Sequence, residues 1–144
     1  RLVGSEMCIR DRTCGHAAAM EYNGDVYACD HFVFPEYKRG NIKTDTLVSM
    51  MLSPEQMAFG NAKRNTLPRQ CRECRFLNLC NGECPKNRIS KTVTGEPGLN
   101  YLCAGLQKYY AHVMPYMNYM AEELKNQRPP ANVMQYAREH LNKK

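Results

Sequence analysis

The spacing of its cysteines constrains this chain more than any other feature. Among the 144 residues there are eight cysteines, several times the usual share of this amino acid. They are Cys8, Cys14, Cys29, Cys71, Cys74, Cys80, Cys84 and Cys103. Such a density indicates a disulfide scaffold, bound metal or redox chemistry.

The middle cysteines favour metal ligation. Cys71 and Cys74 are separated by two residues, and the short loop of such a pair turns both sulfurs toward one metal centre. The next intervals are five residues to Cys80 and three more to Cys84. These are unusual for a tetrahedral zinc site, which tends to use two matched short pairs. Zinc and disulfide bonds stay open as alternative explanations of the pattern.

Hydropathy and charge limit the cellular compartments and the partners that are expected for this chain. The chain has no apolar run of about eighteen residues and no apolar leader near its start, so neither a transmembrane helix nor a secretory signal is visible. We therefore expect a cytoplasmic protein without membrane contact, in a reducing compartment where clustered cysteines are more often metal ligands than disulfides. The net charge is +6, but lysine and arginine form no dense stripe, so nucleic acid is not an expected partner.

Part of the positive charge has a use beside thiolates. Thiolate-bound metal clusters are anionic, and nearby cations lower the free-energy cost of holding them. The basic residues that lie close to the cysteines in sequence are Arg69, Arg72, Arg75 and Lys86.

Residues 17–28 predict a β-hairpin. Two short segments flank Asn23-Gly24, a dipeptide that favours a tight β-turn because both residues tolerate positive φ. Cys14 precedes the hairpin and Cys29 lies at its exit. The hairpin is therefore expected to position two of the thiols.

The following segment predicts loop and then helix. Residues 31–45 carry no regular pattern and are expected to be loop. Residues 46–52 predict a short helix whose apolar side chains Leu47, Met50 and Met51 face inward.

A second helix has a recognisable start signal. Ser53 is suited to the N-cap, Pro54 to the first helical position, and Gln56 follows the cap by three residues. A helix is expected over 54–63. Residues 66–102 hold little periodic apolar pattern, so this segment is expected to need metal to become ordered.

The last part of the chain predicts helices. After Cys103, apolar residues recur every three to four positions, and the tyrosine- and methionine-rich stripe over 109–120 reads as helix core. Pro115 is expected to kink or divide this helix. Residues 131–141 predict a last short helix. The expected fold class is a small, metal-organised α+β domain, with a hairpin and cysteine-rich loops followed by C-terminal helices.

Seven of the cysteines resemble a known signature. The order is Cys-x9-Gly-x4-Cys, a gap, Cys-x2-Cys-x5-Cys-x3-Cys, a gap, and Cys, running from Cys14 to Cys103. This pattern resembles the SPASM domains, the C-terminal part of radical S-adenosylmethionine enzymes that modify peptides and proteins. The resemblance implies two auxiliary [4Fe–4S] clusters. SPASM maturases that form thioether or carbon–carbon links, or an autonomous iron–sulfur or metal-binding module, are the alternatives.

Within that group the chain resembles the anaerobic sulfatase-maturating enzymes. The stretches that carry this resemblance are Cys29-Asp30-His31-Phe32-Val33-Phe34-Pro35-Glu36-Tyr37 and Asn126-Gln127-Arg128-Pro129-Pro130-Ala131-Asn132. The resemblance implies that one cluster is held by Cys71, Cys74, Cys80 and Cys103. It implies that the other is held by Cys14, Cys29 and Cys84, together with Cys8.

The implied reaction is oxidation of a cysteine or serine in a sulfatase polypeptide to Cα-formylglycine. Asp30 matches the residue that serves as base in the family, and an electron-acceptor protein is a further implied partner. S-adenosylmethionine and a third [4Fe–4S] cluster would be bound by Cys-x3-Cys-x2-Cys, a spacing that this chain does not contain. We therefore expect it to be the C-terminal fragment of a longer enzyme and to be inactive alone.

Three parts are expected along the chain. Residues 1–12 have no helical or strand period and resemble translated sequencing-adapter read-through, so we expect them to be foreign. Residues 13–104 would form the SPASM-type domain with twin clusters. Residues 105–144 would form a helical extension that packs on it. Cys8 lies in the foreign-looking segment, at the spacing expected of a native ligand.

Overall fold

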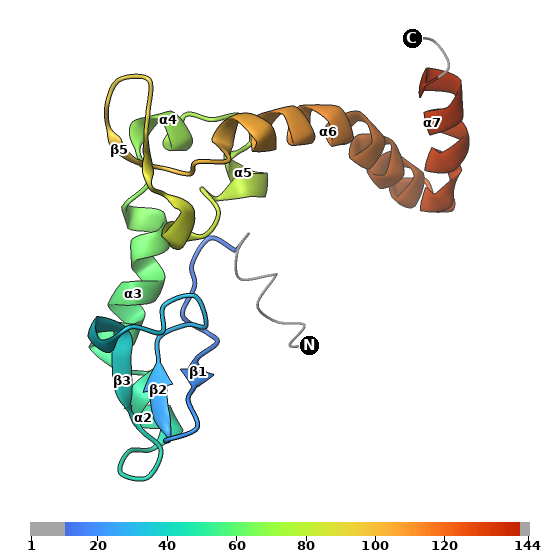
Figure 1. The fold of residues 1–144 in the computed structure, drawn as a ribbon. Helices are drawn as coiled ribbons and strands as arrows, with labels where there is room; N and C mark the ends of the chain where they lie inside the picture. The colour runs from blue at the N-terminus through green and yellow to red at the C-terminus, as the bar shows by residue number, and fades with distance from the viewer. Residues whose placement is uncertain (1–10, 142–144) are drawn as a thin grey trace. The chain divides into compact units, whose positions relative to one another are not determined.

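The computed structural model describes residues 11–141, and the chain divides into two compact units. The N-terminal unit is Arg1–Cys103 and the C-terminal unit is Ala104–Lys144. Small antiparallel sheets and short helices make up the first unit, and helices make up the second (Figure 1). The predicted small α+β fold, with helices at the C-terminal end, is confirmed.

The predicted hairpin is present, with shorter strands than expected. β1 (Ala19–Met20) pairs antiparallel with β2 (Asp25–Tyr27), and Ala19 lies opposite Tyr27. At the turn, Gly24 has a φ of 94°, a conformation that glycine adopts without steric cost.

A third strand, β3 (Lys38–Asn41), pairs with the other edge of β2. The prediction that residues 31–45 are loop is therefore wrong in part. Polar contacts across the strands hold β3: Lys38 Nζ lies 2.6 Å from Asp25 Oδ1, and Asn41 Nδ2 donates to the same oxygen at 2.9 Å. A strand held in this way has no alternating apolar pattern that could reveal it in the sequence.

Both helices predicted after this sheet are present. α2 (Leu47–Met51) begins at Thr46, whose hydroxyl accepts a hydrogen bond from the Ser49 amide at 3.1 Å. Met50 faces inward and is 3% exposed, but Leu47 is 57% exposed. The expectation that Leu47 points inward is wrong, whereas Met51 is half-buried.

α3 (Pro54–Asn65) begins as the sequence predicts and ends two residues later than expected. The Ser53 hydroxyl accepts from the Gln56 amide at 3.1 Å, and Pro54 occupies the first turn. These contacts satisfy the helix N-terminus.

The side chain of Gln56 joins three segments of the N-terminal unit. It is 2% exposed. Its Nε2 donates to the carbonyl oxygens of Gly15 at 2.9 Å and Ala28 at 3.0 Å, and its Oε1 accepts from Arg39 Nε at 2.8 Å. A buried amide with all these partners stabilises the fold, and its loss would leave several buried groups unsatisfied.

The cysteine-rich segment contains more regular structure than the sequence predicts. Two short helices, α4 (Arg69–Arg72) and α5 (Leu77–Cys80), are followed by a second antiparallel hairpin of β4 (Ser90–Lys91) and β5 (Pro97–Leu99). The hairpin was not predicted, because its strands are two and three residues long and one begins with proline and glycine.

In the described part of the C-terminal unit the chain forms two α-helices joined through a 3-10 turn. α6 (Cys103–Lys125) runs through Pro115 without interruption, and it bends along its second half (Figure 1). Pro115 therefore does not divide the helix. α7 (Val133–Leu141) forms where a last helix was predicted, after a 3-10 turn. The ring of Tyr136 on α7 stacks on Tyr119 of α6, with 4.4 Å between centroids.

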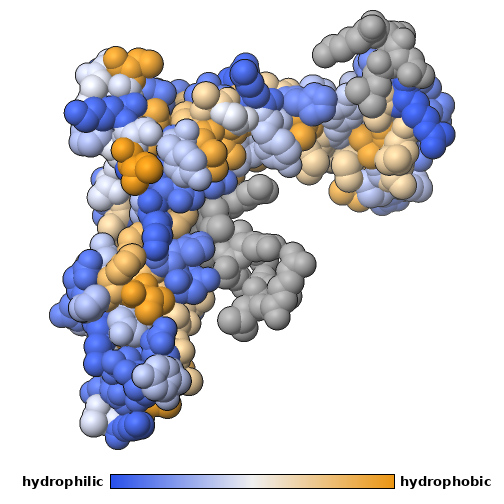
Figure 2. All heavy atoms as spheres, viewed as in Figure 1, coloured by the Kyte–Doolittle hydropathy of each residue, from blue (hydrophilic) through white to orange (hydrophobic). Residues whose placement is uncertain are grey.

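Apolar side chains are buried only in small groups. The buried hydrophobic residues of the described part are Val26, Ala28, Met50, Leu67, Phe76, Cys84 and Tyr110. Of the stripe on α6, Tyr110 is buried whereas Tyr109 and Met117 are half exposed, so the helix-core interpretation holds for only part of it. Hydrophilic residues cover much of the face drawn in Figure 2, with hydrophobic ones in separate patches. None of the described helices is long and apolar enough to cross a membrane.

Glu123 ties α6 to the connection that leads into α7, and we predict that this contact is acid-sensitive. Its Oε1 accepts from Arg128 Nη2 at 2.6 Å, and its Oε2 accepts from Asn132 Nδ2 at 2.6 Å. The hydrogen bonds from Arg128 and then Asn132 hold the pKa of Glu123 below its ordinary 4.5. Because the folded pKa is depressed, this stabilisation is present above about pH 4.5 and is lost as the pH falls through the folded value.

Circular dichroism melts from neutral to acid pH test this contact. E123Q should lower the melting temperature at pH 7 and remove part of the acid sensitivity. E122Q is the matched control, since Glu122 pairs only at the surface with Lys125, and should behave as the unchanged chain. An acid response of E123Q equal to that of the unchanged chain would contradict the assignment.

Candidate metal centres

Three cysteines from distant parts of the sequence line one pocket. Cys14 precedes the first hairpin, Cys29 follows β2, and Cys84 follows α5. We call these the first thiol set. The remaining lining residues are Gly15, Ala17, Asp30, His31, Phe32, Phe59 and Pro85. The structure thus brings together three of the predicted ligands. Cys8, the fourth, lies outside the described residues.

Cys14 is positioned by a close approach to helix α3. Its amide donates to the Gly60 carbonyl at 3.2 Å, and its Sγ lies 4.0 Å from the same oxygen. A Cβ on Gly60 would lie 2.2 Å from the Cys14 carbonyl oxygen, closer than any side chain tolerates. Glycine at position 60 is therefore a steric requirement of the first thiol set.

Cys29 is held at the exit of β2, next to a carboxylate. Its Sγ donates to Asp30 Oδ1 at 3.1 Å. Burial raises the pKa of the Cys29 thiol to about 12, and the neighbouring Asp30 carboxylate adds to the shift. The donor atoms of Cys29, Asp30 and His31 all lie within 4.8 Å of one another. Sulfur, oxygen and nitrogen donors so close together would also suit zinc.

Cys84, which follows α5, is the third member of the first thiol set. It is buried, and its Sγ lies 3.5 Å from His31 Nδ1. Lys86 Nζ donates to the His31 carbonyl at 2.6 Å and lies 4.6 Å from the centroid of the Phe34 ring. The pocket is thereby lined by thiols, flanked by aromatic rings and bordered by a cation.

The second thiol set is Cys71, Cys74, Cys80 and Cys103. These residues lie on α4, between α4 and α5, at the end of α5 and at the start of α6. Burial raises the pKa of Cys71 to about 11, with Cys103, Cys80 and Cys74 contributing as nearby negative charges. The four thiols therefore share one electrostatic neighbourhood.

Both sets fit a thiolate-ligated metal group. None of the seven cysteines among the described residues forms a disulfide bond. With their pKa values raised, Cys29 and Cys71 are protonated near neutral pH, so a metal must displace their protons. Sets of soft sulfur donors select zinc or iron–sulfur clusters. When bound, such clusters supply one-electron redox capacity.

The basic side chains expected beside the cysteines lie in different places. Arg69 makes an exposed pair with Glu73 at 2.7 Å, whereas Lys86 donates to the carbonyl of His31, a residue that lines the first thiol pocket. Two cations that the sequence did not single out, Lys63 and Arg88, are in electrostatic contact with thiols. Neither lies within two residues of a cysteine in the sequence, so spacing alone carries no signal for them.

The chain is similar to a known protein family and to several curated proteins. Residues 8–75 match the family described as SPASM, an iron-sulfur cluster-binding domain. Over 128 residues the chain is 62% identical to the serine-type anaerobic sulfatase-maturating enzyme of Bacteroides thetaiotaomicron, covering 89% of this chain and 31% of that protein. The serine-type enzyme of Klebsiella pneumoniae is 30% identical over 110 residues, covering 76% and 26%. The chain thus spans between a quarter and a third of the length of these curated relatives.

Solved structures show the same relationship. Native anSMEcpe with bound AdoMet superposes with a TM-score of 0.67 at 26% identity, covering 80% of this chain and 31% of that one. Native anSMEcpe with bound AdoMet and Cp18Cys peptide gives a TM-score of 0.69 at 27% identity, covering 85% and 34%.

Gly60 allows a direct test of how the first thiol set is held. G60A should lower the free energy of unfolding by about 1–3 kcal/mol, since the added methyl group forces Cys14 away from α3. Gly105 on α6 is the matched control, because a Cβ there meets nothing within 4 Å. G105A should raise the free energy of unfolding by about 0.5–1 kcal/mol. Urea unfolding followed by circular dichroism measures both changes, and equal tolerance of the two substitutions would contradict the steric argument.

Proposed function

We infer that this chain, which carries a SPASM iron–sulfur cluster-binding domain homologous to the C-terminal part of the anaerobic sulfatase-maturating enzymes, binds two [4Fe–4S] clusters as the auxiliary-cluster part of such an enzyme. The observation that carries the proposal is the convergence of Cys14, Cys29 and Cys84 on one pocket. These residues are up to seventy positions apart in the sequence.

Each thiol set would hold one cluster. The second thiol set supplies four thiols, which is the complete number of ligands for a [4Fe–4S] centre. Its members are Cys71, Cys74, Cys80 and Cys103. The first thiol set supplies three thiols for the other cluster, from Cys14, Cys29 and Cys84. Cys8 is the candidate for the fourth ligand because the match to the SPASM family begins at residue 8.

The whole enzyme would oxidise a serine of a sulfatase polypeptide to Cα-formylglycine. Relatives at 62% and 30% identity are serine-type enzymes, whereas the cysteine-type enzyme of Clostridium perfringens is 26% identical. We therefore favour serine over cysteine as the modified residue. This chain contains no Cys-x3-Cys-x2-Cys spacing, so the S-adenosylmethionine chemistry would belong to an upstream part of the same enzyme.

Asp30 would act as the base. Its carboxylate is exposed, lines the pocket and lies 3.1 Å from Cys29 Sγ. A substrate side chain that entered the pocket would therefore meet a proton acceptor next to a cluster ligand. Oxidation of the serine would remove a hydrogen atom from Cβ, taken by a radical formed in the upstream part, and one electron, for which the auxiliary clusters would be the acceptors. Asp30 would accept the remaining hydroxyl proton on a carboxylate oxygen.

Serine substitutions should separate the two clusters. C103S is expected to remove one cluster, and C84S the other, so each variant retains about half the iron and acid-labile sulfide of the unchanged chain after anaerobic reconstitution. Electron paramagnetic resonance of the reduced proteins should then give two different spectra. Loss of both clusters in each variant, or identical spectra, would contradict the two-set assignment.

Substitution of Asp30 should affect turnover and leave cluster content unchanged. In an enzyme that includes the upstream part, D30N is expected to lower the rate of serine-peptide oxidation by about 10²–10⁴-fold. E36Q is the matched control, since Glu36 is an exposed carboxylate of the same stretch, and should keep the unchanged rate. Mass spectrometry of the peptide measures formylglycine. A D30N enzyme with full activity would overturn the assignment of Asp30 as base.

A further inference from the structure

We propose that Arg88 is a positioning residue shared by the two cluster sites, clamping the segment that joins them and placing one fixed positive charge between them that raises both reduction potentials. This inference rests on the proposed binding of two clusters. It assigns a role to a side chain that is not itself a ligand.

The guanidinium group of Arg88 gathers backbone carbonyls from two segments. Nε donates to Gly82 at 3.0 Å, and Nη2 donates to Asn81 at 3.0 Å and Glu83 at 3.2 Å. Nη1 donates to the Lys63 carbonyl at 2.7 Å. The side chain therefore ties the C-terminal part of α3 to the three residues that separate Cys80 from Cys84.

That three-residue bridge has an unusual backbone. Asn81, Gly82 and Glu83 have φ values of 46°, 70° and 54°. Left-handed conformations of non-glycine residues cost free energy and persist only where the surrounding structure holds them. The bridge joins Cys80 of the second thiol set to Cys84 of the first, so the donors of Arg88 fix the separation of the two sets.

The guanidinium group of Arg88 is hydrogen-bonded to the bridge between Cys80 and Cys84, so its charge lies beside a segment that carries one thiol of each set. Burial lowers the pKa of its guanidinium, while Cys71, Cys14, Cys80 and Cys84 act in the opposite direction when they are thiolates, as they are when they ligate metal. Two of these thiols belong to each set. An arginine keeps its proton under such conditions, so a permanent positive charge lies within electrostatic reach of both.

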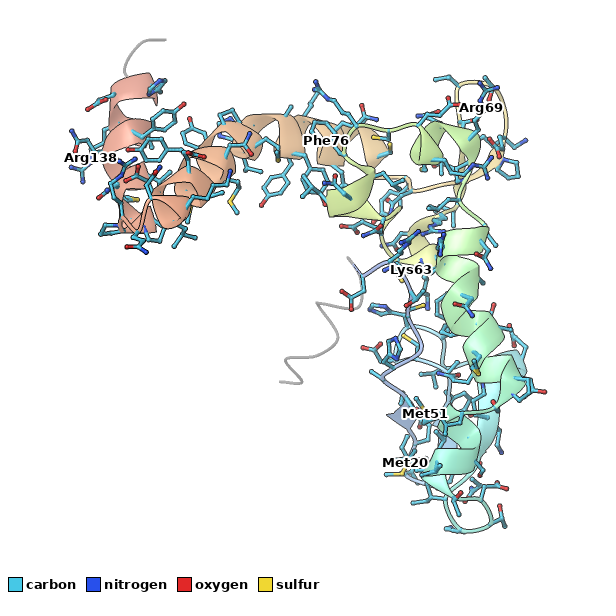
Figure 3. The ribbon with its side chains drawn as sticks, turned by 180° about the vertical axis from the view of Figure 1, so that it is seen from behind. Met20, Met51, Lys63, Arg69, Phe76 and Arg138 are labelled. Carbon is cyan, nitrogen blue, oxygen red and sulfur yellow. The ribbon has the colours of Figure 1, made fainter. Side chains whose placement is uncertain are left out.

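Lys63 provides a contrast within the same region. Its side chain is fully buried on α3, and Figure 3 places it between the part of the N-terminal unit with the three-stranded sheet and the part with α4 and α5. The thiols that act on Lys63 are Cys14 and Cys84, both members of the first set. Its charge should therefore influence one cluster, whereas that of Arg88 should influence two.

A fixed positive charge has a defined effect on a redox centre. One-electron reduction makes a cluster more negative, and a nearby cation stabilises that product in a medium of low dielectric constant. Removing the cation should shift the midpoint potential to more negative values. Lysine would keep the charge of Arg88 but lose the fork of donors, which separates the electrostatic role from the clamp.

Redox titration of the anaerobically reconstituted chain, followed by electron paramagnetic resonance, tests the proposal. R88Q should shift both midpoint potentials to more negative values. K63M should shift only the potential of the cluster held by the first thiol set, which is identified as the signal that C84S lacks. R88K should retain both potentials and lose iron faster to a chelator. R64M is the matched control, because Arg64 is an exposed arginine on α3, and should change nothing.

Two results with cluster-loaded R88Q would contradict the shared role of Arg88. R88Q potentials that match those of R64M, or a shift of one cluster alone, would overturn it. If R88Q holds no cluster, a loaded R88K with unchanged potentials supports the shared charge, and an empty R88K contradicts it. A failure of the unchanged chain to bind iron and sulfide would overturn the proposed function instead, so the two failures are distinguishable.

Discussion

Backbone carbonyls gathered on two polar side chains hold the cysteine-bearing segments of this protein together. Gln56 ties the loop after Cys14 and the residue before Cys29 to α3 through donors at 2.9 and 3.0 Å. Arg88 ties the bridge before Cys84 to the same helix. Because few apolar residues are buried, these contacts supply much of the specificity that a larger hydrophobic core would provide.

The thiols themselves favour a bound metal over an empty site. Their separation from water raises the pKa values of Cys29 and Cys71. Without metal, the protein therefore holds protonated thiols close together, and these thiols stabilise one another only weakly. Coordination replaces these protons by metal–sulfur bonds and converts binding energy into folding energy. The cations near both sets reduce the remaining negative charge. Scaffold and metal group would thus depend on each other.

The cysteine pattern resembles that of a known family, and that resemblance, rather than any local rule, implied which thiols would share a set. The structure brings the three cysteines of the first thiol set to one pocket, although they lie far apart in the sequence. The hairpin with Gly24 and the start of α3 at Ser53, in contrast, follow from local turn and capping chemistry. β3 escaped prediction because its pairing depends on the polar contacts of Asp25. The role of Arg88 could not be predicted, because it depends on hydrogen bonds to α3 and to the bridge. Tertiary contacts of this kind leave no pattern in a single sequence.

If the two thiol sets hold two iron–sulfur clusters, the iron and acid-labile sulfide content of the chain after anaerobic reconstitution will show it. We expect about eight iron atoms and about eight sulfides per chain, as two [4Fe–4S] clusters require. Two zinc ions with no sulfide would contradict this expectation, and would assign the same thiols to structural zinc sites.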